Sequence, residues 1–332
     1  MQLNPALIAL LLGSALTCLL ITYASWFAVR ILMRWNLSSG SEVQLALERR
    51  TYLISTMLAY ALGFELISLF LFVHTAEDLH SLFVGAMCAA GTFYVNPYGY
   101  PALIAKLALF VLAGVWLIIN RADNHCPDYP LIRVKYAWLL VMLPVAIAST
   151  ALTWLFLTGL RADVITSCCG TLFSLGLPDV KDEISLSAPE SYARHALYAS
   201  SALALCSGAY CYFRGRLGAL YAASSLMMLL SGMTALIVLV SPYIYELPTH
   251  HCPFCMLQSD YDYIGYLIYA FLIGGSVTGM GAGLLGYLSG RGRGLDGTLR
   301  AMIRRLTLIS LFMLSAFLAL AGYCVYSSNL VR

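Results

Sequence analysis

Long apolar runs separated by short polar connections recur along the whole chain. Each run is roughly 20 residues long, the length that an α-helix needs to cross the hydrocarbon core of a bilayer. Because backbone polar groups inside lipid must be satisfied within their own segment, such runs predict membrane-spanning helices. Eight are predicted, at residues 6–29, 52–73, 101–119, 137–160, 195–213, 217–240, 263–288 and 306–326. The expected fold is an all-α polytopic helix bundle with the lipid bilayer around it.

Composition agrees with this pattern. Of the 332 residues, 61% are hydrophobic and 11% are charged, whereas a soluble domain has about 25% charged residues. The longest connection, at about 160–194, leaves little chain for a soluble domain. The first run has no basic residue before it and no small-residue cleavage site after it, so we interpret it as a span and not as a cleaved signal.

Charge is distributed unevenly between the two sides that eight alternating helices define. The loops at 30–51, 120–136, 214–216 and 289–305 carry 14 of the 19 Lys and Arg residues. Basic loops stay in the cytoplasm, so both termini are expected outside. In a bacterium this predicts an inner-membrane protein whose outer loops face the periplasm.

Half of the ten cysteines fall in the predicted outer loops, where disulfides form and persist. These five are Cys88, Cys168, Cys169, Cys252 and Cys255. Most histidines are predicted on the same side, namely His74, His80, His195, His250 and His251. The outer cysteines therefore have three candidate uses: a static disulfide, a cycling disulfide, or metal ligands.

The segment His250-His251-Cys252-Pro253-Phe254-Cys255 has the strongest chemical signal. Cys255 is expected in or near the first turn of the seventh span, where the helix N-terminus and a neighbouring imidazolium would favour a thiolate. A redox pair, part of a zinc-type site with His250 or His251, and a static bridge all remain open, because the C-x-x-C spacing occurs in each.

Cys168 and Cys169 are adjacent in the connection before the fifth predicted span. Two neighbouring thiols opposite a second pair suit disulfide exchange through a mixed disulfide. Capture of a soft metal is the competing use, and a single structural bridge with one spare thiol is the third.

A haem or metal site built from histidines is a further alternative. His74 and His195 are predicted at similar depth near the outer surface, and His250 and His251 lie in another outer loop. No C-x-x-C-H motif is present, so covalent c-type haem attachment is excluded by that criterion. Nucleic acid is not an expected partner, because the basic residues are confined to short loops.

Two ionisable residues fall inside predicted spans, Glu65 in the second and Lys106 in the third. Such residues are costly in lipid and usually face a partner or a cavity. Their predicted depths allow the two side chains to meet as an ion pair; a proton path or a quinone headgroup contact are the other uses. Gly275, Gly279 and Gly283 form a small-residue stripe that predicts close helix packing along the seventh span.

The order of these motifs resembles the vitamin K epoxide reductase family and its bacterial disulfide-generating relatives. The residues that carry the resemblance are "TSCCGTLF" in an outer loop, two spans, then "HCPFCML" before the next span, together with "MCAAGTFYVNPYGYPALIAKL". The resemblance implies a four-helix bundle at about 137–288 and a membrane quinone as cofactor. It would make Cys255 the thiol next to the quinone, Cys252 its partner, and Cys168 or Cys169 the shuttle to an outside thiol.

The expected organisation has three parts: a membrane segment at 1–136 whose outer loop holds Cys88, a four-helix redox-like bundle at 137–288, and a basic loop with a final span at 289–332. The expected function is electron exchange between periplasmic thiols, of a protein or a small molecule, and a membrane quinone. Cys252, Cys255, Cys168 and Cys169 would be catalytic, with His250, His251, Cys88, Glu65 and Lys106 supporting. The alternative is a non-enzymatic subunit of a transporter or electron-transfer complex whose Cys/His cluster binds a soft metal or haem.

Overall fold

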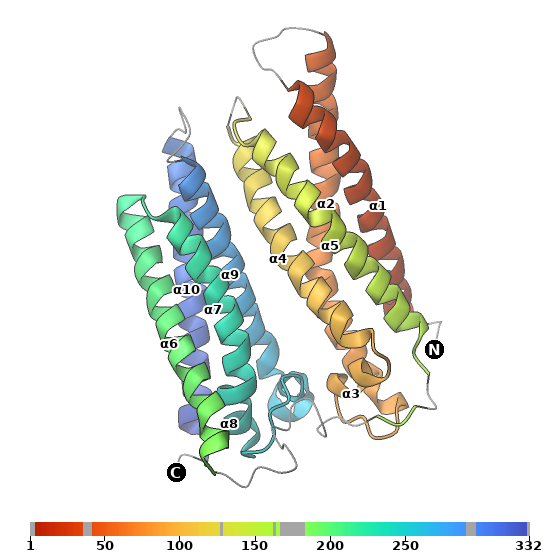
Figure 1. Ribbon diagram of the computed structural model, residues 1–332, viewed down its shortest axis with the longest axis vertical. Helices are drawn as coiled ribbons and strands as arrows, with labels where there is room; N and C mark the ends of the chain where they lie inside the picture. The colour runs from red at the N-terminus through yellow and green to blue at the C-terminus, as the bar shows by residue number, and fades with distance from the viewer. Residues whose placement is uncertain are drawn as a thin grey trace. The chain divides into compact units, whose positions relative to one another are not determined.

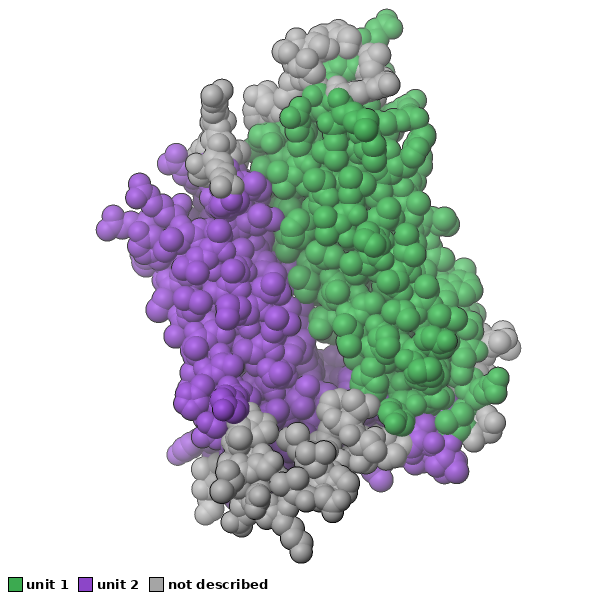
Figure 2. All heavy atoms as spheres, in the orientation of Figure 1, with its two compact units in different colours: residues 1–82, 92–164 green, residues 83–91, 165–332 purple. Residues whose placement is uncertain are grey.

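The computed structural model describes residues 4–35, 42–126, 129–161, 164–166, 183–289 and 297–330. Within these ranges the chain is helical and contains no β-strand, as expected for an all-α bundle. The helices form two compact units (Figures 1 and 2). Unit 1 comprises Met1–Leu82 and Thr92–Val164, and unit 2 comprises Phe83–Gly91 and Ile165–Arg332.

Unit 1 is a bundle of four long helices. They are α1 (Pro5–Arg34), α2 (Glu42–Asp78), α4 (Gly99–Asn124) and α5 (Ile132–Thr158), with the short turn η1 (His80–Leu82) after α2. Helix α1 packs against α2 and α5, and α4 packs against the same two helices. Large buried side chains such as Phe27, Trp116 and Tyr136 fill the centre. The apolar residues of these helices therefore provide both the surface suited to lipid and the packed core of the bundle.

Unit 2 contains a second bundle of long helices. They are α6 (Glu183–Arg214), α7 (Gly218–Ala235), α9 (Ile264–Ser289) and α10 (Gly297–Ser327). Helix α9 packs against α7 and α10, and α6 packs against the same two helices. The predicted small-residue stripe is confirmed as a close contact. A Cβ added at Gly279 would come within 2.4 Å of Ser225 Oγ and 2.7 Å of Ser310 Oγ.

Seven helices in the described residues are long and apolar enough to span a membrane. They coincide with seven of the eight predicted spans, which confirms a multi-pass membrane protein. The fifth predicted span, 195–213, lies inside α6, and α6 is not among the seven. The predicted span itself contains three serines and three tyrosines among its apolar residues, and these lower its apolar character.

The helices are grouped differently from the expected three-part division. That division placed the fourth predicted span at the start of a four-helix bundle at 137–288. The corresponding helix, α5, packs with α1 and α4 in unit 1, whereas α6, α7 and α9 pack with the final helix α10 in unit 2. Packing partners depend on the surfaces that helices present to one another, and the order of helices in the chain does not specify them.

The short segment around Cys88 belongs to unit 2 although its flanking helices belong to unit 1. Residues 83–91 precede and begin α3 (Ala89–Tyr94). The cysteine site described below combines this segment with a second one, the connection between α7 and α9. That connection contains the π-helical turn η2 (Leu236–Val240), α8 (Ser241–Tyr245), η3 (Cys255–Leu257) and η4 (Ser259–Tyr261). Both segments belong to unit 2.

Candidate functional site: three buried cysteines

The chain reaches the cysteine pair through a proline-induced change at the end of α7. In a regular α-helix the Ser241 N–H would donate to the carbonyl of Ile237, and Pro242, one residue further on, has no backbone N–H to replace it. The Ser241 N–H instead donates to Leu236 in a wide π-type turn. His251 Nδ1 donates to the freed carbonyl of Ile237 at 3.1 Å. One of the two adjacent histidines is thereby used to hold the loop against the helix end.

Cys255 does not lie in the first turn of the long helix, as the sequence analysis expected. It begins the separate short turn η3, and α9 starts only at Ile264. Asp262 and Tyr263 interrupt the helix with φ angles of 52° and 54°. A left-handed conformation at two consecutive residues cannot be part of an α-helix. Cys255 is therefore separated from α9 by this break in the helix.

The Cys88 segment is fixed by a close backbone contact within unit 2. Gly85 has a φ of 86°, and the Thr166 N–H donates to the carbonyl of Val84 at 2.9 Å. A Cβ at Gly85 would lie 2.2 Å from the carbonyl oxygen of Thr166. Both the backbone conformation and the available space require glycine at this position.

A side chain from the other half of the site holds the same segment. Gln258 Nε2, between η3 and η4, donates to the carbonyl of Met87 at 2.8 Å. Met87 immediately precedes Cys88, so this hydrogen bond connects the Cys88 backbone to the turn that carries Cys255.

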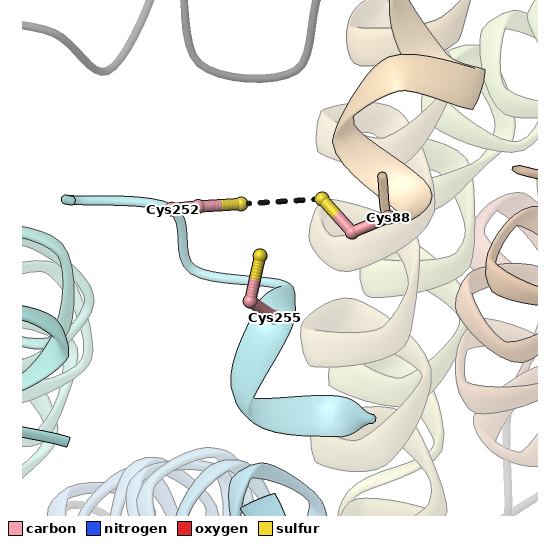
Figure 3. A group of neighbouring side chains, drawn as sticks. All are labelled: Cys88, Cys252 and Cys255. Carbon is pink, nitrogen blue, oxygen red and sulfur yellow. Dashed lines mark hydrogen bonds between the residues drawn. The ribbon is translucent and has the colours of Figure 1, made fainter. Parts of the chain in front are cut away.

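These contacts bring three sulfur atoms together (Figure 3). Cys88 Sγ and Cys252 Sγ are 3.5 Å apart. The sulfurs of Cys88, Cys252 and Cys255 all lie within 4.8 Å of one another. Figure 3 shows the three side chains directed toward a common point, Cys88 from one segment and the other two from the loop before α9. The three residues are 0%, 1% and 5% exposed.

His250 adds an imidazole to the cluster. Its Nε2 lies 3.3 Å from Cys255 Sγ, and its ring packs edge-on against Tyr245, with centroids 4.5 Å apart. His250 is thus the histidine directed at the sulfurs, whereas His251 is hydrogen-bonded to η2. The sequence alone could not distinguish the roles of His250 and His251, because these roles depend on the conformation of the loop.

Hydrogen bonds within the cluster hold the pKa of the Cys252 thiol well below its usual range. The hydrogen bond with Cys255 is the largest cause, followed by that with Cys88, while burial acts in the opposite direction. A smaller contribution comes from His250. The thiolate is the nucleophilic form of cysteine, so Cys252 is the sulfur best prepared to attack or to bind a soft ion.

Two tyrosine hydroxyls hold the backbone of the cysteine loop. Tyr245 OH donates to the carbonyl of Cys252 at 2.6 Å and accepts from the N–H of Met256 at 2.9 Å. Tyr269 OH, from α9, donates to the carbonyl of Pro253 at 2.8 Å. Sequence reasoning missed both, because tyrosines near helix ends are also typical of the membrane interface. Their only signal was proximity in sequence to the cysteine pair.

We expect Tyr245→Phe to loosen the cysteine loop. The substitution leaves the buried Cys252 carbonyl and Met256 N–H without this partner, at a cost of about 1–3 kcal/mol. The thermal midpoint in detergent should fall, and Cys252 and Cys255 should be alkylated faster in the reduced protein. Tyr263→Phe is the matched control, because Tyr263 is 54% exposed. Equal alkylation rates in wild type and Tyr245→Phe would contradict this role.

Two predicted histidines, His74 and His195, are not in the group of close ligand atoms, and two predicted cysteines are not described. Cys168 and Cys169 lie outside the described residues. His74, in unit 1, faces Asp78 at 3.7 Å on its own helix. His195, in unit 2, donates from Nδ1 to the carbonyl of Ser191 at 2.7 Å.

Glu65 and Lys106 meet in the core of unit 1. Lys106 Nζ is 3.5 Å from Glu65 Oε1 and donates to Ser68 Oγ at 2.7 Å. Both side chains are almost fully buried. The sequence did not predict a second buried pair in the same unit, Lys135 with Asp123 at 2.7 Å. Both pairs lie in unit 1, and neither belongs to the cysteine site in unit 2.

No protein-family model, curated protein or solved structure matches the chain. What can be concluded about the site therefore comes from its own geometry. The protein is a multi-pass helical membrane protein. It carries a buried group of three cysteines with the composition and spacing of a metal-ligand set.

Proposed function

We propose that the protein is a membrane thiol–disulfide oxidoreductase that passes electrons from thiols outside the membrane to a membrane quinone. The observation that carries this proposal is the 3.5 Å separation of Cys88 Sγ and Cys252 Sγ, with Cys255 Sγ in the same buried cluster. Three sulfurs at such distances allow one thiolate to attack a disulfide formed by the other two.

The proposed cycle begins with a disulfide between Cys252 and Cys255. The Cys88 thiolate attacks Cys252 Sγ, so a Cys88–Cys252 bond forms and the Cys255 thiolate leaves. One thiolate of an outside dithiol then attacks Cys88 Sγ, and the Cys252 thiolate leaves. The second outside thiol displaces Cys88 as the outside disulfide forms, so that all three cysteines of the cluster are reduced. The thiols of Cys252 and Cys255 finally transfer two electrons and two protons to the quinone, which becomes a quinol and restores their disulfide.

His250 supports the step in which Cys255 leaves. Its Nε2 is 3.3 Å from Cys255 Sγ, close enough to donate a hydrogen bond to the developing thiolate. Thiolates with lower pKa leave faster in disulfide exchange. The depressed pKa of Cys252 likewise favours this sulfur as the nucleophile that re-forms the disulfide.

The order of cysteine motifs supports the quinone as electron acceptor, through the resemblance to vitamin K epoxide reductase-like proteins. That resemblance gives Cys168 or Cys169 the role of shuttle; the geometry favours Cys88 for contact with Cys252. The proposed location is a bacterial inner membrane with the cluster at the periplasmic face, as the excess of basic residues in the opposite loops indicates. The outside partner would be a thiol protein or a small thiol.

The proposal is tested by the redox state of the cysteines. The purified protein is mildly reduced without oxygen, and a short-chain quinone is added or omitted. Free thiols are then labelled and located by mass spectrometry. We expect Cys252 and Cys255 to become protected from labelling only with quinone, with one quinol formed per disulfide.

The exposed Cys206 in α6 provides an internal control, because its labelling should not change with quinone. Continued labelling of Cys252 and Cys255 after quinone addition would refute quinone-linked oxidation. Resistance of these cysteines to reduction would instead indicate a static bridge.

The grouping of three buried sulfurs also favours a second candidate: a non-enzymatic subunit of a transporter or electron-transfer complex that holds a soft metal. Haem has less support, because His74 faces Asp78 and His195 donates to the carbonyl of Ser191. A purified protein with stoichiometric metal or a Soret band, and without quinone-dependent disulfide formation, would favour this candidate.

A further inference from the structure

The three sulfurs form a triangle whose dimensions suit a single ion. With metal–sulfur bonds of about 2.3 Å, three sulfurs arranged trigonally around one ion are about 4.0 Å apart. In the protein, Cys88 Sγ and Cys252 Sγ are 3.5 Å apart, and no two of the three sulfurs are farther apart than 4.8 Å. Shifts of a few tenths of an ångström in side-chain position are therefore enough for three equal bonds.

The backbone around the triangle is held in place before any ion binds. Tyr245 OH and Tyr269 OH fix the carbonyls of Cys252 and Pro253. Gln258 Nε2 fixes the carbonyl next to Cys88. A ligand set on a fixed backbone loses little conformational freedom when it binds, and this favours tight binding.

We propose that the reduced cluster is a three-thiolate site for a soft d10 cation, Cu(I), formed by Cys88, Cys252 and Cys255. Each thiol releases its proton and donates a sulfur lone pair to the ion, with no change in oxidation state. Soft thiolate ligands select Cu(I), zinc and iron–sulfur clusters over harder ions.

Among the residues that the structure describes, three sulfurs form the cluster, and this number favours Cu(I) over zinc. Zinc in structural sites almost always takes four ligands, whereas Cu(I) is satisfied by three thiolates. His250 Nε2 is directed at Cys255 Sγ, at 3.3 Å, and does not belong to the group of mutually close ligand atoms. In the copper-bound form it would act as a hydrogen-bond donor to a bound sulfur.

Copper binding would compete with the proposed reaction, and this inference rests on the proposed function to that extent. A sulfur that holds Cu(I) in this site is not free to form the Cys252–Cys255 disulfide. Copper would therefore keep the cluster reduced and block electron transfer to quinone. The reduced form of the enzyme would therefore be the form that copper inhibits.

The test uses the full-length protein in detergent, reduced and kept free of oxygen. Cu(I) is supplied from a chelator that buffers its free concentration, and bound copper is measured by elemental analysis together with sulfur-to-copper charge-transfer absorption. We expect one copper per chain. Loss of a residue that only hydrogen-bonds to a metal ligand typically lowers metal affinity by about 10–100-fold. Cys88→Ser removes a ligand itself, so the affinity for copper should fall by at least this factor. Cys206→Ser, in which an exposed cysteine is removed, should bind like wild type.

A measurement on the unaltered protein makes the test independent of the folding of any variant. Copper should protect Cys88, Cys252 and Cys255 together from alkylation, and should prevent their oxidation by quinone. Equal copper binding by wild type and Cys88→Ser, protection of other cysteines only, or a preference for zinc over Cu(I) would overturn the proposal. Quinone-dependent oxidation in copper-free protein would still establish the proposed function separately.

Discussion

Cys252→Ser is expected to abolish quinone-dependent thiol oxidation, with a loss of at least about 10³-fold in rate, the order of effect seen when a nucleophile is removed. Cys252 is the only one of the three cysteines that participates in both disulfides of the proposed cycle. A serine hydroxyl can form neither bond. The rate is measured as quinol production from a dithiol donor by the detergent-solubilised protein.

Cys255→Ser is the informative companion variant, because it removes one disulfide of the proposed cycle and leaves the other possible. The Cys252–Cys255 disulfide that quinone restores cannot form in this variant, so quinol production should stop. When a thiol oxidant such as diamide replaces quinone, we expect a Cys88–Cys252 linked peptide, found by mass spectrometry, since these sulfurs are 3.5 Å apart.

The matched controls are cysteines outside the cluster. Cys18→Ser in unit 1 and Cys206→Ser in unit 2 should retain wild-type rates. Full activity of Cys252→Ser would reject the assignment of this residue. A linked peptide that joins Cys252 to Cys168 or Cys169, and never to Cys88, would return the shuttle role to the pair implied by the family resemblance.

Lys106→Met is expected to destabilise unit 1 by about 3–5 kcal/mol, the usual cost of leaving one partner of a buried ion pair uncompensated. Lys106 Nζ lies between Glu65 Oε1 at 3.5 Å and Ser68 Oγ at 2.7 Å. The double variant Glu65→Leu/Lys106→Met removes both charges and should lose much less stability. Thermal and denaturant unfolding in detergent measure the difference, followed by a tryptophan signal in unit 1 such as that of Trp116.

The control pair is Arg194 and Glu190, which form an exposed i,i+4 ion pair in α6. An exposed pair contributes about 0–1 kcal/mol, so Arg194→Met should have little effect. If the double variant in unit 1 were as unstable as Lys106→Met, Glu65 and Lys106 would not act as a compensating pair. A proton-transfer role would then require a loss of activity at unchanged stability.

The membrane-spanning helices could be predicted because their cause is local. A run of apolar residues of sufficient length forms a helix in lipid whatever its neighbours are. The contact along Gly275, Gly279 and Gly283 was predictable for a similar reason, since small residues repeated every fourth position let another helix approach. The pairing of Glu65 with Lys106 followed from two charges at similar depth in adjacent spans.

The grouping of helices and the composition of the cluster could not be predicted in the same way. Cys88 and Cys252 are 164 residues apart, and nothing local to either residue indicates the other. The start of α9 was predicted within one residue, but Cys255 was wrongly expected in or near its first turn, because nothing in the sequence marks the left-handed backbone at Asp262 and Tyr263. The loop before them is held by His251 on the carbonyl of Ile237, which the π-type hydrogen bond of Ser241 leaves free, and this shift of the helical hydrogen bonds is visible only in the structure.

The 164-residue separation of Cys88 and Cys252 also has a consequence for biosynthesis. At translation rates of about 5–20 residues per second, Cys88 exists for roughly 8–33 s before Cys252 has been made. Cys168 and Cys169 emerge within that interval. In an oxidising compartment the early cysteines can therefore pair with one another before the native partner arrives. Correct assembly of this site then depends on isomerisation of such early disulfides, or on their prevention until the last helices have been inserted.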